Sequence, residues 1–479
     1  MDLASLTPIV NGQPWVIGDE LAVMEPATGA ELCKVPNVGP EGVNAAVAAA
    51  VAAKPGWAAT PPKDRAAMLS ELADAVIKNA DAFAELESRD VGKPLAKARG
   101  EMISAADKYR FFGGACRTLT VPSSDEYKPG ITSFVRREPV GVVAAIAPWN
   151  YPMGLTAWKI APALAAGNPV VLKPTEVTPL TAMLLGQFAS AILPPGVLNV
   201  VTGSGATTGA ALVRHRDVAM VSLTGGTATG RAVMREAADS IKKVHLELGG
   251  KAPVLVFEDA DLDLLCQTLK AASFGNSGQD CTAACRVYVE RSRYSAVVDM
   301  LVETAKSIKV GNGFTDTAAE MGPVVSSKHR AYVSGFVERA RSSGYARVVA
   351  GGKEEGPGFY YLPTVVADVQ HADEIVQEEI FGPVIAVSSF SNEDEAVAKA
   401  NDINYGLAAS VWSKDVGRAI SAACRIEAGT VWINDHGPTM TEMPFGGYKQ
   451  SGIGRDLSIY AVEAHTQLKH VAVTHRKSI

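Results

Sequence analysis

The stretch Val142-Val143-Ala144-Ala145-Ile146-Ala147, followed by Pro148-Trp149-Asn150-Tyr151-Pro152, begins the region that decides the fold. It is a short apolar strand, and helical and strand-like segments alternate after it. The predicted helices are Thr156–Ala166, Thr181–Ile192, Thr207–Arg214 and Gly230–Ser240, and the predicted strands are Pro169–Leu172, Val197–Thr202, Val218–Leu223 and Lys243–Leu248. This alternation predicts a parallel, doubly wound sheet.

The same pattern continues on the C-terminal side, from Pro253 to about Thr430. The sequence therefore predicts two α/β regions, which join near Glu247–Lys251. Outside them, the composition predicts helix from Val43 to Ser88 and from Lys97 to Thr118. Strand-like character is predicted for Thr132 to Pro139, and for an edge strand over Leu468–Thr474.

The length and composition of the chain limit the kinds of protein that it can be. A chain of 479 residues is too long for one small domain, and 47% hydrophobic against 20% charged residues is typical of a globular protein. A net charge of -6 argues against a broad basic surface, so we expect no nucleic-acid partner. No signal peptide or membrane-spanning apolar run is recognised, and the six scattered cysteines do not suggest a disulfide framework. We therefore expect a cytoplasmic enzyme with no membrane partner.

The segment Phe274-Gly275-Asn276-Ser277-Gly278-Gln279-Asp280-Cys281 contains a candidate nucleophile. Because the run Thr282–Cys285 is compatible with helix, we predict that Cys281 lies at a helix N-terminus, whose field favours the thiolate. Taken alone, a cysteine is more often a buried, inert structural residue, so the case for a nucleophile depends on the segments around it. Cys281 and Cys285 are spaced C-x-x-x-C without a nearby His or second Cys pair, which argues against a metal site. Cys285 is read either as a packed residue or as a thiol that protects Cys281 by a reversible disulfide.

Polar residues follow several of the predicted strands. Glu247 ends an apolar strand before Leu248-Gly249-Gly250-Lys251, where a carboxylate is placed to act as a general base. Asn150 follows another strand, and its amide is suited to donate to a developing oxyanion. An ordinary turn residue is the alternative reading of each position taken alone.

Two further segments have features of a dinucleotide site. Lys173 and Glu176 follow a strand three residues apart, which suits ribose hydroxyls, although a solvated loop is a fair alternative. The strand-to-helix turn Leu223-Thr224-Gly225-Gly226-Thr227-Ala228-Thr229-Gly230 offers backbone amides to a phosphate. It is not the usual G-x-G-x-x-G pattern, so taken alone it is a weak signal.

Together these segments resemble the aldehyde dehydrogenase superfamily, along nearly the whole chain from about Val10. The ordered motifs that carry the resemblance are Pro148-Trp149-Asn150, Lys173-Pro174-Thr175-Glu176, Glu247-Leu248-Gly249-Gly250-Lys251, Gly278-Gln279-Asp280-Cys281, Glu379-Ile380-Phe381-Gly382-Pro383 and Pro444-Phe445-Gly446-Gly447. By resemblance, Cys281 attacks the aldehyde carbon, and the Asn150 amide with the Cys281 backbone N–H stabilises the oxyanion. A hydride passes to a nicotinamide, and Glu247 activates the water that hydrolyses the thioester.

The resemblance also implies the cofactor site. Lys173 and Glu176 would bind the adenosine ribose, Glu379 the nicotinamide ribose, and Phe381 would pack near the nicotinamide. The complete predicted set is Trp149, Lys173, Glu176, Gly225, Gly226, Thr227, Leu248, Gly249, Glu379 and Phe381. Because a carboxylate at Glu176 repels a 2′-phosphate, NAD is favoured over NADP. Gly226 departs from the family, which commonly has Ser there, so one hydroxyl contact to the pyrophosphate is lost.

The substrate class is predicted from the segment after Asn150, which in this family forms one wall of the substrate tunnel. Tyr151 and Trp158 are two helical turns apart, so they can share one face, although both can also be plain packing residues. Enzymes for succinate semialdehyde usually have Arg in place of Trp158, whereas an aromatic wall suits an ammonium group. The predicted substrate-binding residues are Tyr151, Trp158, Asp107, Asp280, Thr282 and Phe445.

The Cys281 segment and Tyr109-Arg110-Phe111-Phe112 most resemble γ-aminobutyraldehyde dehydrogenases of putrescine and polyamine degradation. The prediction is therefore oxidation of 4-aminobutanal, or 3-aminopropanal, with Asp107 or Glu101 facing the amine unless these are ordinary surface acids. Gly275 and Phe445 stand where plant aminoaldehyde enzymes often have Trp, which disfavours trimethylated substrates. The alternatives are a broad-specificity, aryl or betaine aldehyde dehydrogenase, a CoA-acylating relative, and a non-catalytic protein of the same fold; the presence of Glu247 argues against CoA acylation.

The resemblance implies an α/β fold of two doubly wound domains plus a small β oligomerisation flap. The NAD-binding domain would comprise residues 1–121 and 141–246 with 446–463, and the catalytic domain residues 247–445. The flap would comprise residues 122–140 and 464–479. Because exposed edge strands need covering, we expect the flap to pair with another subunit in a homo-dimer or homo-tetramer.

Overall fold

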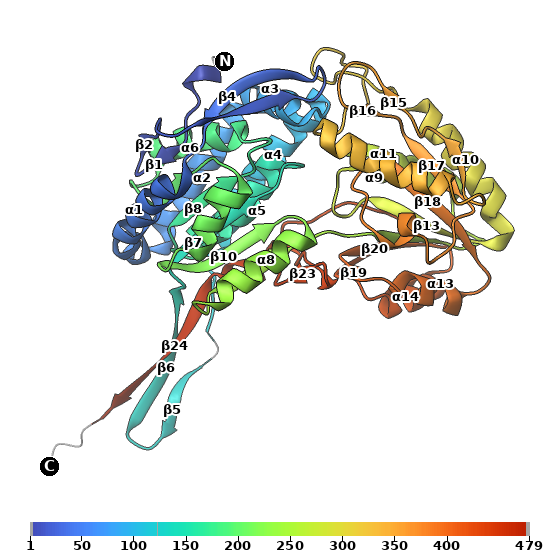
Figure 1. The fold of residues 1–479 in the computed structure, drawn as a ribbon. Coiled ribbons are helices and arrows are strands. Elements are labelled where there is room, and N and C mark those ends of the chain that lie inside the picture. Colours follow the sequence, from blue (N-terminus) through green and yellow to red (C-terminus); the bar gives the residue numbers. More distant parts are fainter. Residues whose placement is uncertain (1–2, 122, 476–479) are drawn as a thin grey trace.

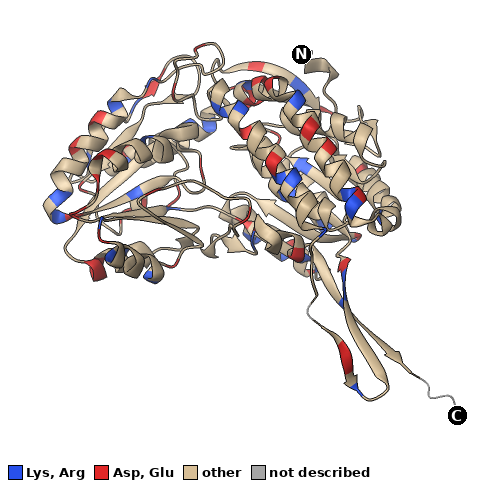
Figure 2. Cartoon of the chain, turned by 180° about the vertical axis from the view of Figure 1, so that it is seen from behind, with Lys and Arg blue, Asp and Glu red and all other residues tan. Residues whose placement is uncertain are grey.

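The computed structural model describes residues 3–121 and 123–475, and has two α/β halves with a strand flap projecting from one of them (Figure 1). The predicted flap residues 122 and 476–479 lie outside the described residues. Lys and Arg are interspersed with Asp and Glu over the helices (Figure 2). Over the described ranges, no helix combines the length and apolar character needed to cross a bilayer.

The first half is built on a sheet whose central strands are parallel. In spatial order its strands are β2 (Gln13–Pro14), β1 (Ile9–Val10), β9 (Leu198–Val200), β8 (Val170–Pro174), β7 (Val142–Ala147), β10 (Val218–Thr224), β11 (Lys243–Glu247) and β23 (Gly452–Ile453). Strand β23 comes from far along the chain and pairs antiparallel with β11. It therefore brings the segment after residue 446 back to the first sheet.

Helices cover both faces of this sheet. They are α1 (Gly39–Ala59), α2 (Pro62–Lys78), α3 (Ala80–Val91), α4 (Leu95–Ala115), α5 (Pro152–Ala165), α6 (Leu180–Ile192), α7 (Ala210–Arg214) after a π-turn (Gly205–Gly209), α8 (Thr227–Ala238) and α15 (Ser458–Ala464). Along β7, Val143 and Ala145 pack into one hydrophobic cluster while Val142 and Ala144 pack into another. Burial on both faces explains why this strand is a continuous apolar run.

The second half has its own sheet, in which five of the six strand pairings are parallel. Its strands are β14 (Arg347–Ala350), β17 (Thr364–Ala367), β18 (Val384–Phe390), β13 (Ala284–Glu290), β12 (Ala252–Val256), β20 (Ala408–Trp412) and β21 (Thr430–Ile433). Its helices are α9 (Leu262–Phe274), α10 (Tyr294–Ser307), α11 (Ser327–Arg341), α12 (Glu374–Gln377), α13 (Glu393–Asn401) and α14 (Val416–Arg425). The predicted α/β fold with two doubly wound regions is confirmed.

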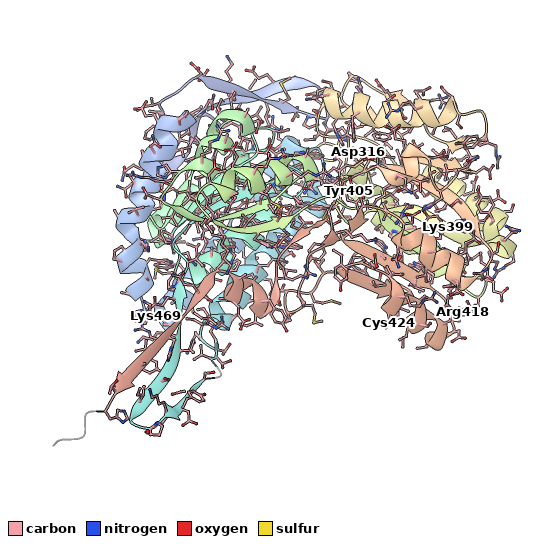
Figure 3. All side chains as sticks on the ribbon, turned by 60° about the horizontal axis from the view of Figure 1, so that its bottom comes forward. Asp316, Lys399, Tyr405, Arg418, Cys424 and Lys469 are labelled. Atoms are coloured by element: carbon pink, nitrogen blue, oxygen red, sulfur yellow. The ribbon has the colours of Figure 1, made fainter. Side chains whose placement is uncertain are left out.

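The flap consists of β5 (Ser124–Lys128), β6 (Ile131–Pro139) and β24 (Thr466–Thr474). Strand β24 pairs antiparallel with β6 along its full length, so the predicted tail strand is present and starts two residues earlier. Lys469, labelled on β24 in Figure 3, lies on this projecting element. Three two-stranded antiparallel sheets are also present among the described residues: the hairpins of β3 (Glu20–Glu25) with β4 (Ala30–Pro36) and of β15 (Glu354–Glu355) with β16 (Tyr360–Tyr361), and the long-range pair of β19 (Tyr405–Gly406) with β22 (Tyr448–Lys449).

The predicted helical run from Val43 to Ser88 is not one helix. Pro61 and Pro62 separate α1 from α2, because proline lacks the N–H that would continue the helix, although it is tolerated in a first turn. Asn79 separates α2 from α3, and its side-chain amide donates to the Ala75 carbonyl at 2.8 Å. The composition thus predicts the helical character of this region correctly, but it does not predict where one helix ends and the next begins.

Candidate active site

Cys281 lies in a turn between a short 3-10 helix (Gly275–Gly278) and strand β13. The prediction that Cys281 enters a helix is wrong: a turn follows it, and Ala284 already belongs to β13. Asn276 and Ser277 have φ of 48° and 59°, so the backbone before the thiol is held in a left-handed bend. The thiol therefore does not stand at the start of a helix, and the predicted source of a lowered pKa is missing.

Asn150 is in contact with the segment that holds the thiol. Its Nδ2 donates to the Gln279 carbonyl at 3.1 Å, and Asn276 Nδ2 donates back to the Asn150 carbonyl at 2.9 Å. Asn150 is 3% exposed, and its amide retains a second N–H. The structure thus brings together the predicted oxyanion donor and the turn before Cys281.

Asp280 is held by three hydrogen bonds. Tyr151 Oη donates to Oδ2 at 2.7 Å, and the Thr282 backbone N–H and hydroxyl both donate to Oδ1 at 2.7 Å. Among the described residues, Asp280 forms no ion pair with Lys, Arg or His. An uncompensated carboxylate therefore stands directly before the nucleophile.

Glu247 ends strand β11, as predicted, and is 1% exposed. Burial raises its pKa from 4.5 to about 7, whereas Lys159, Cys281 and Thr224 act to lower it. Burial, followed by the charges of Glu247 and Asp280, raises the pKa of the Cys281 thiol well above 9.0. The resting thiol is consequently protonated, and a carboxylate with a near-neutral pKa stands beside it.

The glycine pair after Glu247 has a steric purpose. A Cβ on Gly249 would come within 2.2 Å of Glu379 Oε2, and one on Gly250 within 2.3 Å of the Cys281 carbonyl oxygen. Glu379 Oε1 accepts a hydrogen bond from the Gly250 N–H at 2.9 Å, and burial raises the pKa of this carboxyl to about 7. Two glycines therefore let the nucleophile turn and Glu379 approach the same backbone.

The predicted phosphate and ribose residues lie at neighbouring strand ends. Helix α8 begins at Thr227 with Gly226 as its N-cap, and a Cβ on Gly226 would meet nothing within 4 Å, so space is open before the helix. Lys173 Nζ lies 3.5 Å from Glu176 Oε2, and Glu176 Oε1 accepts a bond of 3.4 Å from the Gly205 N–H. Open amides beside a carboxylate fit the pyrophosphate and ribose of a dinucleotide.

Trp149 and Phe381 form an aromatic corner, with ring centroids 5.1 Å apart and nearly perpendicular. Phe381 has a φ of 56°, a conformation unfavourable for a bulky residue. His329 on α11, which the sequence prediction missed, packs edge-on to Trp149 and contacts the Phe381 carbonyl oxygen at 2.7 Å through Nε2. The contact with His329 on α11 thus helps to hold the strained backbone of Phe381 in place.

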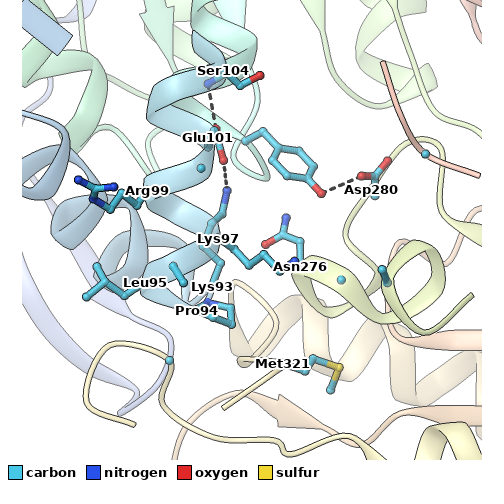
Figure 4. A pocket seen from close by; sticks show the side chains of 18 of the residues that line it. Lys93, Pro94, Leu95, Lys97, Arg99, Glu101, Ser104, Asn276, Asp280 and Met321 are labelled. Carbon is cyan, nitrogen blue, oxygen red and sulfur yellow. Dashed lines mark hydrogen bonds and ion pairs between the residues drawn. The ribbon is translucent and has the colours of Figure 1, made fainter. Parts of the chain in front are cut away.

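A cavity of about 1070 Å³ lies in front of the thiol. Tyr151, Trp158 and Phe445 line it, and the Trp158 and Phe445 rings meet edge to face at 5.0 Å. Tyr151 and Trp158 share one apolar cluster with Cys281, as their spacing predicted. Asp280 and Glu101 approach the cavity from different elements (Figure 4).

Asp107 does not line this cavity, contrary to its predicted place in the substrate site. It is exposed on α4, and its Oδ2 accepts a hydrogen bond from the Thr441 hydroxyl at 3.0 Å. Glu101, two turns earlier on the same helix, is the acidic residue that lines the cavity. The helix was identified correctly, but the periodicity did not decide which of its acids faces inward.

Buried charges that the sequence prediction missed lie behind Glu101. Lys93 is 3% exposed, pairs with both Glu87 and Glu101, and places its ammonium 4.4 Å from the Tyr151 ring centre. Although burial disfavours the charge, Glu101 and Glu87 raise the pKa of Lys93. Lys93 stands in the short segment between α3 and α4, where only the run Gly92-Lys93-Pro94 signalled a break between helices.

Lys108 also lines the cavity and is 5% exposed. Its Nζ donates to Ser104 Oγ at 2.6 Å, and it forms no ion pair within the described part of the chain. Burial lowers the pKa of this ammonium. Among the described residues that line the cavity, Lys108 is therefore a buried cation without an ion pair, as Asp280 is a carboxylate without one.

The remaining cysteines do not gather around Cys281 as metal ligands. Within residues 3–121 and 123–475, no group of three His, Cys, Asp or Glu side chains is placed to hold a metal ion. Burial raises the pKa of Cys285, which argues against an easily oxidised thiolate. Cys424 is exposed on α14 (Figure 3) and is not one of the residues that line the cavity.

These groups form one arrangement that suits covalent chemistry on a carbonyl compound. A thiol lines an aromatic-walled cavity, and an amide donor and a buried carboxylate of near-neutral pKa lie next to the segment that holds this thiol. Amides and carboxylates suited to a dinucleotide approach from the first sheet. Such a set supports nucleophilic attack, oxyanion stabilisation and general-base catalysis.

Comparison with known proteins agrees with this arrangement. The sequence profile of the aldehyde dehydrogenase family matches residues 15–471. The chain is 40% identical to a betaine aldehyde dehydrogenase of Bacillus subtilis (strain 168), over 98% of this chain and 97% of that protein. It is also 40% identical to a 2-aminomuconic semialdehyde dehydrogenase of Danio rerio, over 94% of each chain.

Solved structures give the same result. An NAD+ complex of an aldehyde dehydrogenase from Bacillus cereus superposes with a TM-score of 0.96 at 38% identity, covering 99% of this chain and 98% of that one. A betaine aldehyde dehydrogenase of Staphylococcus aureus, also solved with NAD+, superposes with a TM-score of 0.95 at 35% identity, covering 99% and 96%.

Proposed function

The chain belongs to the aldehyde dehydrogenase family and is an NAD-dependent aldehyde dehydrogenase, and we propose that its substrate is an aldehyde that carries an amine, foremost 4-aminobutanal. The product would be 4-aminobutanoate, which places the enzyme in the breakdown of putrescine. The observation that carries the proposal is the unpaired carboxylate of Asp280, set beside the aromatic wall of the cavity.

In the proposed mechanism, Cys281 is the nucleophile. Glu247 takes the thiol proton, because its raised pKa leaves it basic enough near neutral pH to do so. The second N–H of the Asn150 amide and the Cys281 backbone N–H then donate to the oxyanion of the thiohemiacetal. After oxidation to the thioester, Glu247 gives up the first proton to solvent and, as a carboxylate again, removes a proton from water, which attacks the acyl carbon and releases the Cys281 thiolate.

NAD, when bound, accepts the hydride of the aldehyde carbon. The residues that would hold it are Gly225, Gly226 and Thr227 at the pyrophosphate, with Lys173 and Glu176 at the adenosine ribose. Glu379 would bind the other ribose, with Trp149, Leu248, Gly249 and Phe381 around the nicotinamide end. The open start of α8 and the close approach of Glu379 to Gly249 support this assignment.

The preference for an amine follows from the charges near the thiol. An ammonium is attracted both by the face of an aromatic ring and by a carboxylate without a cation partner, and Asp280 is such a carboxylate. Tyr151, Trp158 and Phe445 provide the rings. Glu101 adds a second carboxylate on the cavity wall, although Lys93 already pairs with it.

The test is a comparison of kcat/KM for NADH formation across aldehydes of matched length. We expect 4-aminobutanal to exceed pentanal and succinate semialdehyde by about tenfold or more, the effect of about 1.4 kcal/mol. Asp280→Asn should remove most of the advantage over pentanal, whereas Asp107→Asn, outside the cavity, should keep it. A wild-type preference for the acidic aldehyde or for an aryl aldehyde would overturn the assignment.

A second candidate has one observation in its favour. Lys108 is an unpaired cation on the cavity wall, which suits the distant carboxylate of an acidic semialdehyde. The relative from Danio rerio is named for such a substrate. Succinate semialdehyde in the same panel, assayed also with Lys108→Met, decides this alternative, because loss of the cation should selectively reduce its kcat/KM.

We also propose that the flap pairs with a second copy of the chain. Strand β24 leaves Leu468 65% and Val473 47% exposed, an arrangement that needs covering. Light scattering after gel filtration should give a mass of a dimer or tetramer of the 50.1 kDa chain. A single species at the mass of one chain would contradict this assembly.

A further inference from the structure

His436 is a buried histidine outside the set that the proposed mechanism uses. It is 5% exposed and lies in the loop between β21 and Phe445. Its Nε2 is 2.7 Å from the Thr282 carbonyl oxygen, and its Nδ1 is 2.8 Å from Ser410 Oγ on β20. The ring packs against that of Trp432, with centroids 4.8 Å apart.

These contacts fix the protonation of the ring. A carbonyl oxygen only accepts hydrogen bonds, so Nε2 carries the proton and donates to Thr282. Nδ1 then accepts from the Ser410 hydroxyl, whose oxygen in turn accepts from Trp412 Nε1 at 3.1 Å. Burial lowers the pKa of His436 below 6.5, which agrees with a neutral ring.

The chain of bonds continues to the residues around the thiol. Thr282 receives the bond from His436 on its carbonyl and donates its own N–H and hydroxyl to Asp280. Cys281 lies between these two residues, so its backbone is tied on both sides. Gly437, next to His436, lines the substrate cavity.

We propose that His436 is a positioning residue, which sets the place of the Cys281 thiol by donating a hydrogen bond from Nε2 to the Thr282 carbonyl. The inference rests on the proposed role of Cys281 as nucleophile, but not on the identity of the aldehyde. His436 touches neither substrate nor cofactor in this role. It acts by holding the turn from the β20 side of the second sheet.

Two amide variants separate the two ends of the ring. His436→Gln places an amide N–H near the position of Nε2, so it keeps a donor for the Thr282 carbonyl. His436→Asn is shorter, reaches only to the position of Nδ1, and keeps only the contact with Ser410. The matched control is His371→Asn, which by the same geometry keeps the Nδ1 contact and loses the contact of His371 Nε2 with Asp402 Oδ2 at 3.0 Å, outside the nucleophile turn.

The experiment measures three quantities on the full-length protein with NAD. They are the rate of Cys281 alkylation by iodoacetamide, followed by mass spectrometry; kcat and KM for a simple aldehyde that the enzyme turns over; and Kd for NAD. We expect His436→Asn to lower the alkylation rate and kcat by about tenfold or more, with little change in KM or in Kd for NAD. His436→Gln should stay within about threefold of wild type, as should His371→Asn.

The outcomes separate the possible failures. Equal losses in the Asn and Gln variants, with a fall in melting temperature in both, would overturn the proposal in favour of plain packing. Unchanged alkylation and kcat in His436→Asn would also overturn it. If instead alkylation of Cys281 left the wild-type dehydrogenase activity intact, the proposed function itself would fail.

Discussion

The hydroxyl of Tyr151 donates a hydrogen bond of 2.7 Å to Asp280 Oδ2, and so joins the start of α5 to the residue before the nucleophile. The same ring has the Lys93 ammonium 4.4 Å from its centre. Tyr151 is thus both a wall of the substrate cavity and a support for the nucleophile turn.

Tyr151→Phe should therefore lower kcat by about three- to tenfold, because a hydrogen bond to a charged acceptor contributes about 1.5–3 kcal/mol and only part of it acts on the reaction. The measurement is steady-state NADH formation. Tyr109→Phe is the matched control, because the buried Tyr109 hydroxyl has no hydrogen-bond partner among the described residues. Equal effects of the two substitutions would contradict the role given to the Tyr151–Asp280 bond.

The pH dependence should follow Glu247. Only its carboxylate form accepts a proton, and its pKa is raised to about 7, so kcat/KM should rise with pH up to about 7 and then level off. Below about pH 7, kcat/KM should fall by close to tenfold for each unit of pH. Glu247→Gln should lose this limb together with most of the turnover. If kcat/KM of Glu247→Gln rose with pH as steeply as that of the wild type, a group other than Glu247 would be responsible for the pH dependence.

Cofactor choice should depend on Glu176, whose side chain is 38% exposed beside Lys173. Glu176→Gln removes the charge that would repel a 2′-phosphate, and the NADP to NAD ratio of kcat/KM should rise by about tenfold. The exposed Glu303→Gln, whose partner is Lys306, serves as a control for general charge effects. A ratio that stays at the wild-type value would remove Glu176 from the specificity argument.

Gly249→Ala should weaken NAD binding. Its Cβ would overlap Glu379 Oε2 at 2.2 Å, so the carboxylate must move away from the proposed nicotinamide ribose. We expect Kd for NAD, measured by calorimetry, to increase by about tenfold or more. Gly114→Ala, in a helix with open space around the new Cβ, should leave Kd unchanged. An unchanged Kd in Gly249→Ala would contradict the cofactor role of Glu379.

Much of the fold could be predicted because both sheets are buried on both faces. The apolar runs that result, such as Val142–Ala147 and Ala252–Val256, are distinct even in a single sequence. The strand ends then placed Asn150 and Glu247 at one edge. Neither periodicity nor motif order could reveal the turn at Cys281, because its left-handed residues Asn276 and Ser277 are held by long-range contacts.

The support of the site was the harder part to predict. His436 acts through Thr282, which is distant in the sequence, and Lys93 through Glu87 and Glu101 on the two flanking helices; a lone His or Lys carries no pattern that indicates burial. The sequence also could not show which acid of α4 faces the cavity. Asp107 and Glu101 are both compatible with the helix, and only its packing in the fold places Glu101 on the cavity wall.

Three hydrogen bonds described above cross from the segment after β7 to the segment before β13: those from Asn150 to Gln279, from Asn276 to Asn150, and from Tyr151 to Asp280. These bonds connect the two halves of the subunit directly at the reaction centre. If the two halves moved apart here, the oxyanion donor Asn150 would be separated from the turn that holds Cys281. We therefore expect that losing these three bonds lowers catalysis even while both halves stay folded.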